Sequence, residues 1–202
     1  MKKLIFSIMM ALMCGMMFSC TQCSTAAPEN DQTAVEDTAV IVKNDYFRGI
    51  LLKIWPIMNK KYPDYAFYEA SGHLKKLEKD NMWGVDHNTF SATYNSLVGP
   101  ASVVVYVEND TLKFKEKDEP WIGDRYTTPF VMCDLTLAIE TLQKEINYVP
   151  KEGTPVVLRH QVHPNICEPQ YIIGGMVSCH AVNAYSLKVD PLSDGEDVVE
   201  QK

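Results

Sequence analysis

The sequence lacks the short motifs that carry much enzymatic and nucleotide-binding chemistry. It has no glycine-rich loop that could cradle a phosphate, no nucleophile-elbow serine and no motif of paired carboxylates. It also lacks a basic cluster, since 26 acidic residues outnumber 19 basic ones and the net charge is −7. An acidic chain of this kind is a poor partner for nucleic acid and for anionic lipid bound by charge. We therefore expect no nucleic-acid partner and no cofactor.

Cysteine is scarce for a fold built on disulfides. The 202 residues include six cysteines, far fewer than small disulfide-stabilised domains carry, and the part expected to fold has no Cys-x-x-Cys pair. One bridge is compatible with the sequence, because Cys167 and Cys179 flank an expected hairpin. The spacing alone does not fix this connectivity.

The first nineteen residues have the pattern of a targeting signal. Lys2 and Lys3 precede an apolar run over residues 4–18 that is too short to span a bilayer comfortably. The run ends in Met17-Phe18-Ser19-Cys20, which resembles the lipobox of bacterial lipoprotein precursors. In that family the chain is cleaved before the cysteine, which receives the lipid. The resemblance implies that Cys20 is acylated and anchors the protein in the cell envelope, at the outer membrane.

Composition divides the remainder into three parts. Residues 20–44 are expected to form an acidic flexible tether, because Ala, Thr, Ser and Gln dominate and little apolar surface is available for burial. Residues 45–189 are expected to form the globular domain. Residues 190–202 carry five acids and a glycine and are expected to form a loose acidic tail.

One helix is expected to organise the globular domain. Thr128 offers an N-cap hydroxyl and Pro129 fits the first helical position, so the helix is predicted from there to Tyr148. Apolar residues recur along it at three- and four-residue steps: Met132, Leu135, Ile139, Leu142 and Ile146. An earlier stripe predicts another helix, which kinks or restarts at Pro56: Phe47, Ile50, Leu51, Ile54, Trp55 and Met58.

Strand-like segments lie on both sides of the later helix. Residues 65–70 are predicted to form a strand that ends in a turn at Ser71-Gly72, and residues 90–97 a short helix. The best hairpin joins a strand covered on both faces, residues 102–107, to a strand over residues 111–117. Three more strands are predicted over residues 154–163, 171–174 and 179–189. The predicted fold class is α+β, with antiparallel sheet covered by two main helices. The order is compatible with a two-fold α-β repeat, with halves 45–126 and 127–189.

The join between the first helix and the first strand, Lys60-Lys61-Tyr62-Pro63-Asp64-Tyr65-Ala66-Phe67, resembles that of PepSY-like domains. That group includes folds of the beta-lactamase-inhibitor type. The resemblance implies binding to a protein rather than chemistry.

Cys133 is the candidate nucleophile. A cysteine near a helix N-terminus gains thiolate character, and a histidine on a neighbouring strand can act as its base. His180 and Asp190 follow in an order similar to that of NlpC/P60-type cysteine hydrolases, which cleave cell-wall peptides; this resemblance implies a catalytic set of Cys133, His180 and Asp190. The alternative is that Cys133 and Leu137 extend the buried stripe as apolar side chains.

Histidines and cysteines crowd into a short segment: His160, His163, Cys167, Cys179 and His180. A strand would point His160 and His163 to opposite faces, so they could share an ion only if the chain bent between them. We therefore expect His160 to be a core histidine and predict no metal site.

The leading interpretation is an envelope-anchored lipoprotein that binds a protein or a peptide. Trp83 and Trp121 fall outside the apolar stripes, and such side chains are common interface anchors. The alternative is the peptidoglycan hydrolase that uses Cys133 and His180.

Overall fold

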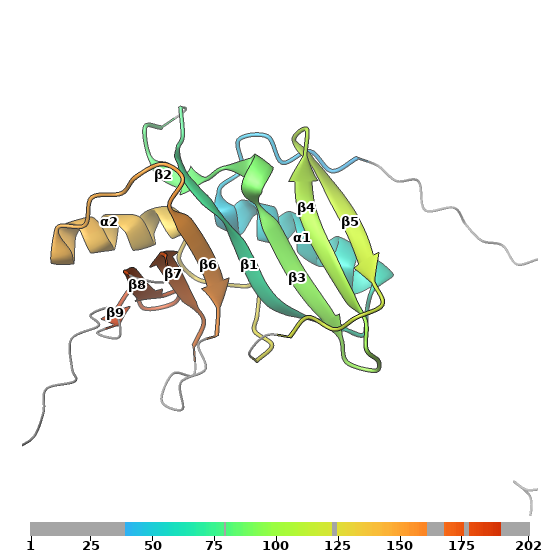
Figure 1. Cartoon of the computed structure of the whole chain (residues 1–202). Helices are drawn as coiled ribbons and strands as arrows, with labels where there is room; N and C mark the ends of the chain where they lie inside the picture. The colour runs from blue at the N-terminus through green and yellow to red at the C-terminus, as the bar shows by residue number, and fades with distance from the viewer. Residues whose placement is uncertain (1–38, 79, 123–124, 161–167, 176–177, 191–202) are drawn as a thin grey trace, which may run out of the picture. The chain divides into compact units, whose positions relative to one another are not determined.

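The computed structural model describes residues 39–78, 80–122, 125–160, 168–175 and 178–190, and within them it shows two α-helices and a nine-stranded antiparallel sheet (Figure 1). The strand order is β5-β4-β3-β1-β6-β7-β8-β9, with β2 paired to β1 beside this path. The α+β class is confirmed. The elements are α1 (Phe47–Lys61), β1 (Tyr65–Lys76), β2 (Trp83–Val85), β3 (Ser91–Ser96), β4 (Ser102–Glu108), β5 (Thr111–Lys117), α2 (Leu135–Ile146), β6 (Pro155–Arg159), β7 (Gln170–Gly174), β8 (Cys179–Asn183) and β9 (Val189–Asp190).

The first helix is the one that the apolar stripe predicts. Its buried residues are those of the stripe with the exception of Trp55, which is half-buried and packs edge-on against Phe130 at 4.7 Å between ring centroids. The helix extends through Pro56 to Lys61 as one element. Lys60 and Lys61 in its last turn complement the negative end of the helix dipole.

The second helix begins later than the sequence suggested. Thr128 and Pro129 were predicted as its start, but its N-cap is Asp134, whose carboxylate accepts a hydrogen bond from the Thr136 N–H. The preceding residues are held by other partners, because the Cys133 N–H donates to the carbonyl of Ala184 at 3.0 Å. Tertiary hydrogen bonds therefore keep this segment out of the helix.

The buried face of α2 also differs at its edges from the predicted stripe. Leu135, Ile139 and Leu142 are fully buried, as expected. Met132 is 67% exposed because it precedes the helix, and Leu137 and Ile146 are exposed as well. The predictions for these three residues are wrong. Thr136 and Ala138 take the remaining buried positions.

Strand β1 runs through the turn that was predicted at Ser71-Gly72. Gly72 is needed there for packing rather than for a turn, since a Cβ atom at this position would lie 2.3 Å from Cγ2 of Val85. The glycine therefore lets β2 lie close against β1.

The short helix predicted over residues 90–97 is absent from the described structure. A 3₁₀ turn, His87–Thr89, is followed by β3, in which Ala92 and Tyr94 are buried in the main core. Phe90, Ala92 and Tyr94 recur every second residue, which is the period of a strand.

The predicted hairpin of β4 and β5 is confirmed. Its connecting residues Asn109 and Asp110 have φ values of 50° and 57°, so both adopt the left-handed conformation of a type I′ turn. Strand β4 is less enclosed than predicted, because Val104 and Tyr106 are only half-buried on one of its faces.

The last strands are shorter than expected. The segment predicted as one strand over 179–189 forms β8 and β9, separated by a turn in which the Asn183 side chain accepts from Tyr185 N and Ser186 N. Asp190, assigned to the tail, ends β9 and accepts a hydrogen bond from Gln170 Nε2 at 2.9 Å. Residues 1–38, which include the predicted leader, and residues 191–202 lie outside the described residues.

Residues 39–44, which the sequence assigned to the tether, contact the sheet. Val42 is fully buried and its N–H donates to the carbonyl of Asp110 at 2.9 Å, while Ile41 forms a bridge with Thr111. The chain therefore enters the domain beside the start of β5.

The main core lies on one face of the sheet, between the strands and the two helices (Figure 1). Residues opposite one another in antiparallel strands point to the same face, and one such row crosses the core from β4 to β8: Val105, Ala92, Ala70, Leu158, Tyr171 and Val182. Phe47 of α1 packs against Tyr171, whose hydroxyl donates to the carbonyl of Cys133 just before α2. Both helices therefore share this face. In the described part of the chain, neither has the length and apolar content needed to cross a membrane.

Candidate functional site

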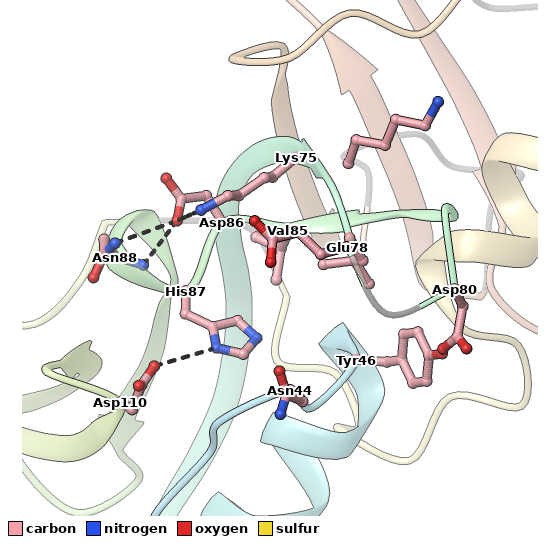
Figure 2. Close-up of a pocket in the computed structure, with 12 residues that line it drawn as sticks. Asn44, Tyr46, Lys75, Glu78, Asp80, Val85, Asp86, His87, Asn88 and Asp110 are labelled. Atoms are coloured by element: carbon pink, nitrogen blue, oxygen red, sulfur yellow. Dashed lines mark hydrogen bonds and ion pairs between the residues drawn. The ribbon is translucent and has the colours of Figure 1, made fainter.

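A pocket of about 260 Å³ opens at one end of the sheet, where the β1–β2 hairpin, the β4–β5 turn and the start of α1 meet (Figure 2). Buried Val85 lies in its lining. The remaining lining residues are Asn44, Tyr46, Lys75, Lys76, Leu77, Glu78, Asp80, Asp86, His87, Asn88 and Asp110.

The lining is predominantly acidic. Glu78, Asp80, Asp86 and Asp110 contribute four carboxylates and the lining has two lysines, which gives −2 when His87 is neutral. Because a partly enclosed surface screens charge less well than open solvent, these carboxylates favour a cation over an anion.

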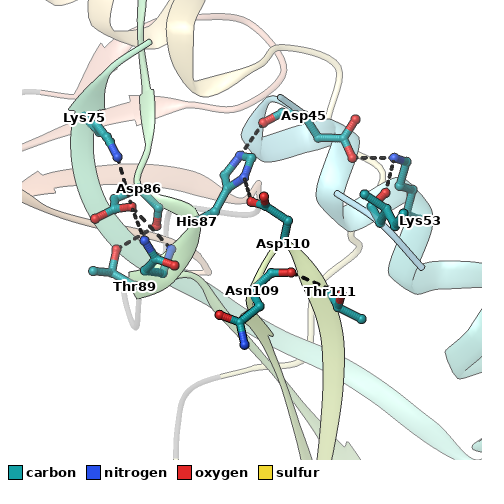
Figure 3. A network of polar contacts seen from close by, with 11 residues as sticks. Asp45, Lys53, Lys75, Asp86, His87, Thr89, Asn109, Asp110 and Thr111 are labelled. Carbon is teal, nitrogen blue, oxygen red and sulfur yellow. Dashed lines mark hydrogen bonds and ion pairs between the residues drawn. The ribbon is translucent and has the colours of Figure 1, made fainter. Parts of the chain in front are cut away.

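His87 has a defined proton at one ring nitrogen. Its Nε2 lies 2.8 Å from the carbonyl oxygen of Asp45, and a carbonyl can only accept, so Nε2 donates. Nδ1 faces the Asp110 carboxylate at 4.0 Å (Figure 3). In the neutral ring Nδ1 is unprotonated, and Asp110 then has no cation at this position.

Asp86 fixes the shape of the adjoining wall. Its carboxylate accepts from the Asn88 N–H at 3.3 Å and pairs with Lys75 Nζ at 3.7 Å. Its backbone carbonyl accepts from the Thr89 hydroxyl at 2.9 Å (Figure 3). That hydroxyl accepts from the His73 N–H on β1. The 3₁₀ turn that carries His87 is thus held against β1.

The opposite wall is held by the start of α1. The Tyr46 hydroxyl donates to the Asp80 carboxylate, which links the helix to the β1–β2 hairpin. This hydrogen bond, with a smaller contribution from burial, raises the pKa of Tyr46, so the phenol stays protonated and continues to donate. Asp45 forms an ion pair with Lys53 at 2.6 Å (Figure 3).

The pocket lining offers several negatively charged acceptors to a cationic group. The lining residues that the structure describes include no cysteine, serine or threonine. Among the described residues, no group of three or more histidine, cysteine or carboxylate side chains is arranged to hold a metal ion. Asp110, whose side chain is 51% exposed, can accept further hydrogen bonds from a cationic ligand.

The residues proposed for catalysis do not come together. Cys133 lies just before α2, whereas His180 packs edge-on against Tyr148, which follows the other end of that helix. A helix of twelve residues is about 18 Å long, so the thiol and the imidazole are separated by far more than hydrogen-bond reach. Asp190 accepts from Gln170 instead.

The environment of Cys133 favours the thiol form. Its Sγ donates to the carbonyl of Tyr185 at 3.3 Å. Burial raises the pKa of Cys133, and the nearby Arg48 opposes this only in part. The interpretation of Cys133 as a partly buried, protonated side chain therefore fits the geometry better than that of a nucleophile.

Of the other sequence-predicted site residues, the structure describes His160 and Cys179. His160 follows β6, and burial, with a smaller contribution from Arg125, lowers its pKa. His163 and Cys167 lie outside the described residues, so the Cys167–Cys179 disulfide stays a prediction. Cys20 also lies outside them.

Sequence patterns alone do not single out the pocket residues. Local signals existed, because Asp86-His87-Asn88-Thr89 has the composition of a capped turn and Asn109-Asp110 that of a type I′ turn. Neither signal indicates that the two turns meet, since that follows from the pairing of β3 with both β1 and β4.

No protein-family model matches the chain, and no significantly similar curated protein or solved structure was found.

Proposed function

We propose that this chain is a lipid-anchored envelope protein whose folded domain binds a protein or peptide ligand. In this proposal the pocket receives a cationic group of the ligand, such as a lysine side chain or a peptide amino terminus. The lipobox-like sequence that ends at Cys20 supports the anchoring.

The acidic pocket is the observation that carries the binding proposal. Hydrogen bonds from Tyr46 and from the Asn88 N–H hold the Asp80 and Asp86 carboxylates, so these two are positioned before a ligand arrives. Such preorganisation reduces the entropy that binding must overcome. Lys75 already pairs with Asp86, whereas Asp110 lies at the longer distance of 4.0 Å from His87, which makes Asp110 the first carboxylate to test.

The binding test uses full-length protein in detergent micelles and N-acetylated, C-amidated Ala-Lys-Ala and Ala-Glu-Ala as probes. We expect the lysine peptide to bind with a dissociation constant on the order of 1 mM, about −4 kcal/mol, and to shift the amide NMR signals of His87 and Asp110. Binding should weaken as salt is added, because the contact is ionic.

Asp110→Asn is the informative variant, because asparagine also adopts the left-handed conformation and preserves the turn. It should weaken binding of the lysine peptide about 1.4- to fivefold, since exposed ion pairs contribute roughly 0.2–1 kcal/mol. Asp64→Asn is the matched control, since Asp64 is exposed and is not part of the pocket lining. Equal binding of the glutamate peptide would refute the proposal.

Anchoring has a separate test. Cys20→Ser should abolish incorporation of labelled palmitate in cells and release the protein from the membrane fraction, although Cys23 remains. Continued labelling of the variant would contradict the assignment of Cys20.

A further inference from the structure

Four large apolar side chains are exposed at the end of the sheet opposite the pocket. Leu97 and Val98 occupy the β3–β4 turn and are 62% and 80% exposed. Trp121 and Ile122 follow β5 and are 39% and 94% exposed. We call these four residues the apolar tip. The seven residues of β4 separate this end from the β4–β5 turn beside the pocket by about 23 Å (Figure 1).

The two segments of the apolar tip are held together. The Trp121 N–H donates to Asn95 Oδ1 and Asn95 Nδ2 donates to the Trp121 carbonyl, both at 2.8 Å. Asn95 is buried in β3 and lies two residues before Leu97. The hydroxyl of buried Ser102 donates to the carbonyl of Glu119 at 2.7 Å. The exposed apolar side chains therefore project from a fixed backbone.

A single exposed leucine or valine needs no explanation, but four such side chains on adjacent segments form a patch that favours a partner. The chain beside Trp121 carries Lys117, Asp118 and Glu119, a net charge of −1. That balance does not favour an anionic surface. Tryptophan beside aliphatic side chains suits the boundary between lipid headgroups and acyl chains.

From these observations we propose that the apolar tip inserts shallowly into the surface of a zwitterionic lipid bilayer. The proposal rests on the anchoring at Cys20 put forward above. Eighteen residues separate Cys20 from Ala39, and the nineteen residue-to-residue steps between them can extend to about 65 Å. The chain enters the domain beside Asp110, about 23 Å from the tip, so its length allows the tip to reach the membrane that holds the anchor.

Tethering would raise the local concentration of the tip at the membrane, so that a weak apolar contact suffices. Insertion would also orient the domain. With the apolar tip in the bilayer, the acidic pocket at the opposite end of the sheet faces away from the membrane and is open to ligands in the envelope.

Quenching of tryptophan fluorescence by brominated lipid tests the proposal. Full-length protein is reconstituted into phosphatidylcholine vesicles whose acyl chains carry bromine either near the headgroup or near the chain end. We expect quenching that is stronger with the shallow bromines, lost in Trp121→Phe and retained in the matched control Trp83→Phe. Joint replacement Val98→Ser with Ile122→Ser should reduce the quenching while the circular dichroism spectrum is unchanged.

Two outcomes would overturn the proposal. In protein shown to be acylated by palmitate labelling, equal spectra in brominated and ordinary lipid would mean that the tip stays out of the bilayer, while the anchor stands. Concentration-dependent self-association in detergent, abolished by Ile122→Ser, would assign the tip to contact between copies. Failure of the peptide-binding test affects neither result, because the pocket and the tip lie at opposite ends of the sheet.

Discussion

Replacement of Asp134 by alanine should destabilise both helices together. Asp134 is the N-cap of α2, where one carboxylate oxygen accepts from the Thr136 N–H at 3.2 Å. The other oxygen accepts from the Arg48 N–H in the first turn of α1 at 2.8 Å. Tyr46, the N-cap residue of α1, forms no capping hydrogen bond through its own side chain. One carboxylate therefore serves both helix N-termini.

The expected loss of stability in Asp134→Ala follows from the loss of two N-caps and of one negative charge beside two helix N-termini. Loss of an N-cap side chain costs about 0.5–2 kcal/mol, and a negative charge near a helix N-terminus contributes about 0.3–1 kcal/mol. For two helices we expect Asp134→Ala to lower the free energy of unfolding by roughly 2–4 kcal/mol. Asp134→Asn should lose about half of that, because it keeps one acceptor oxygen but no charge.

Urea unfolding followed by circular dichroism measures the effect, with the midpoint compared at equal slope. Asp86→Ala is the matched control, because Asp86 caps only the 3₁₀ turn and its loss should cost about 1 kcal/mol. If Asp134→Ala were no more harmful than Asp86→Ala, the reasoning that one carboxylate stabilises two helices would be wrong.

Three further predictions concern titratable groups. The Tyr94 hydroxyl is buried without a hydrogen-bond partner among the described residues, so Tyr94→Phe should be neutral or stabilising. Tyr171→Phe loses the hydrogen bond to the Cys133 carbonyl and should lower the free energy of unfolding by about 0.5–1.5 kcal/mol. The reverse order of the two variants in thermal unfolding would contradict this prediction. Burial raises the pKa of Cys133, so iodoacetamide should alkylate Cys133 more slowly in native protein than in unfolded protein. Peptide mass spectrometry measures the alkylation, and rapid alkylation of native protein would restore the hydrolase hypothesis. Burial lowers the pKa of His160 in the folded protein, so on acidification the unfolded state takes up this proton at a higher pH than the folded state does. His160 should therefore lower the free energy of unfolding as the pH falls below about 6.5. The difference in unfolding free energy between wild type and His160→Gln should therefore change between pH 7 and pH 5. Parallel curves of unfolding free energy against pH for the two proteins would refute this prediction.

Local sequence patterns were sufficient to predict the helices and strands whose apolar residues recur with a strong period. The stripe of α1 depends on side chains of that segment alone, and only Trp55 departs from it by remaining half-buried. The β4–β5 hairpin follows from Asn109 and Asp110, whose short polar side chains tolerate the left-handed conformation. These features fixed the α+β class without knowledge of the strand order.

Other elements depended on partners that are distant in sequence. Thr128 and Pro129 satisfy the local rules for a helix start, but the hydrogen bond from Cys133 to Ala184 and the capping by Asp134 place the start at Leu135. Ser71-Gly72 has the composition of a turn, and only the packing of Val85 against Gly72 explains why the strand continues.

The sequence by itself determined the acidic balance, the apolar face of α1 and the alternation of the strands, because each depends on composition or on neighbours along the chain. The tertiary structure decided which side chains meet. It placed Cys133 and His180 beside opposite ends of α2, and it brought His87 and Asp110 together at one end of the sheet. Such distances depend on strand order and helix length, since backbone hydrogen bonds between distant segments fix positions that no local spacing contains.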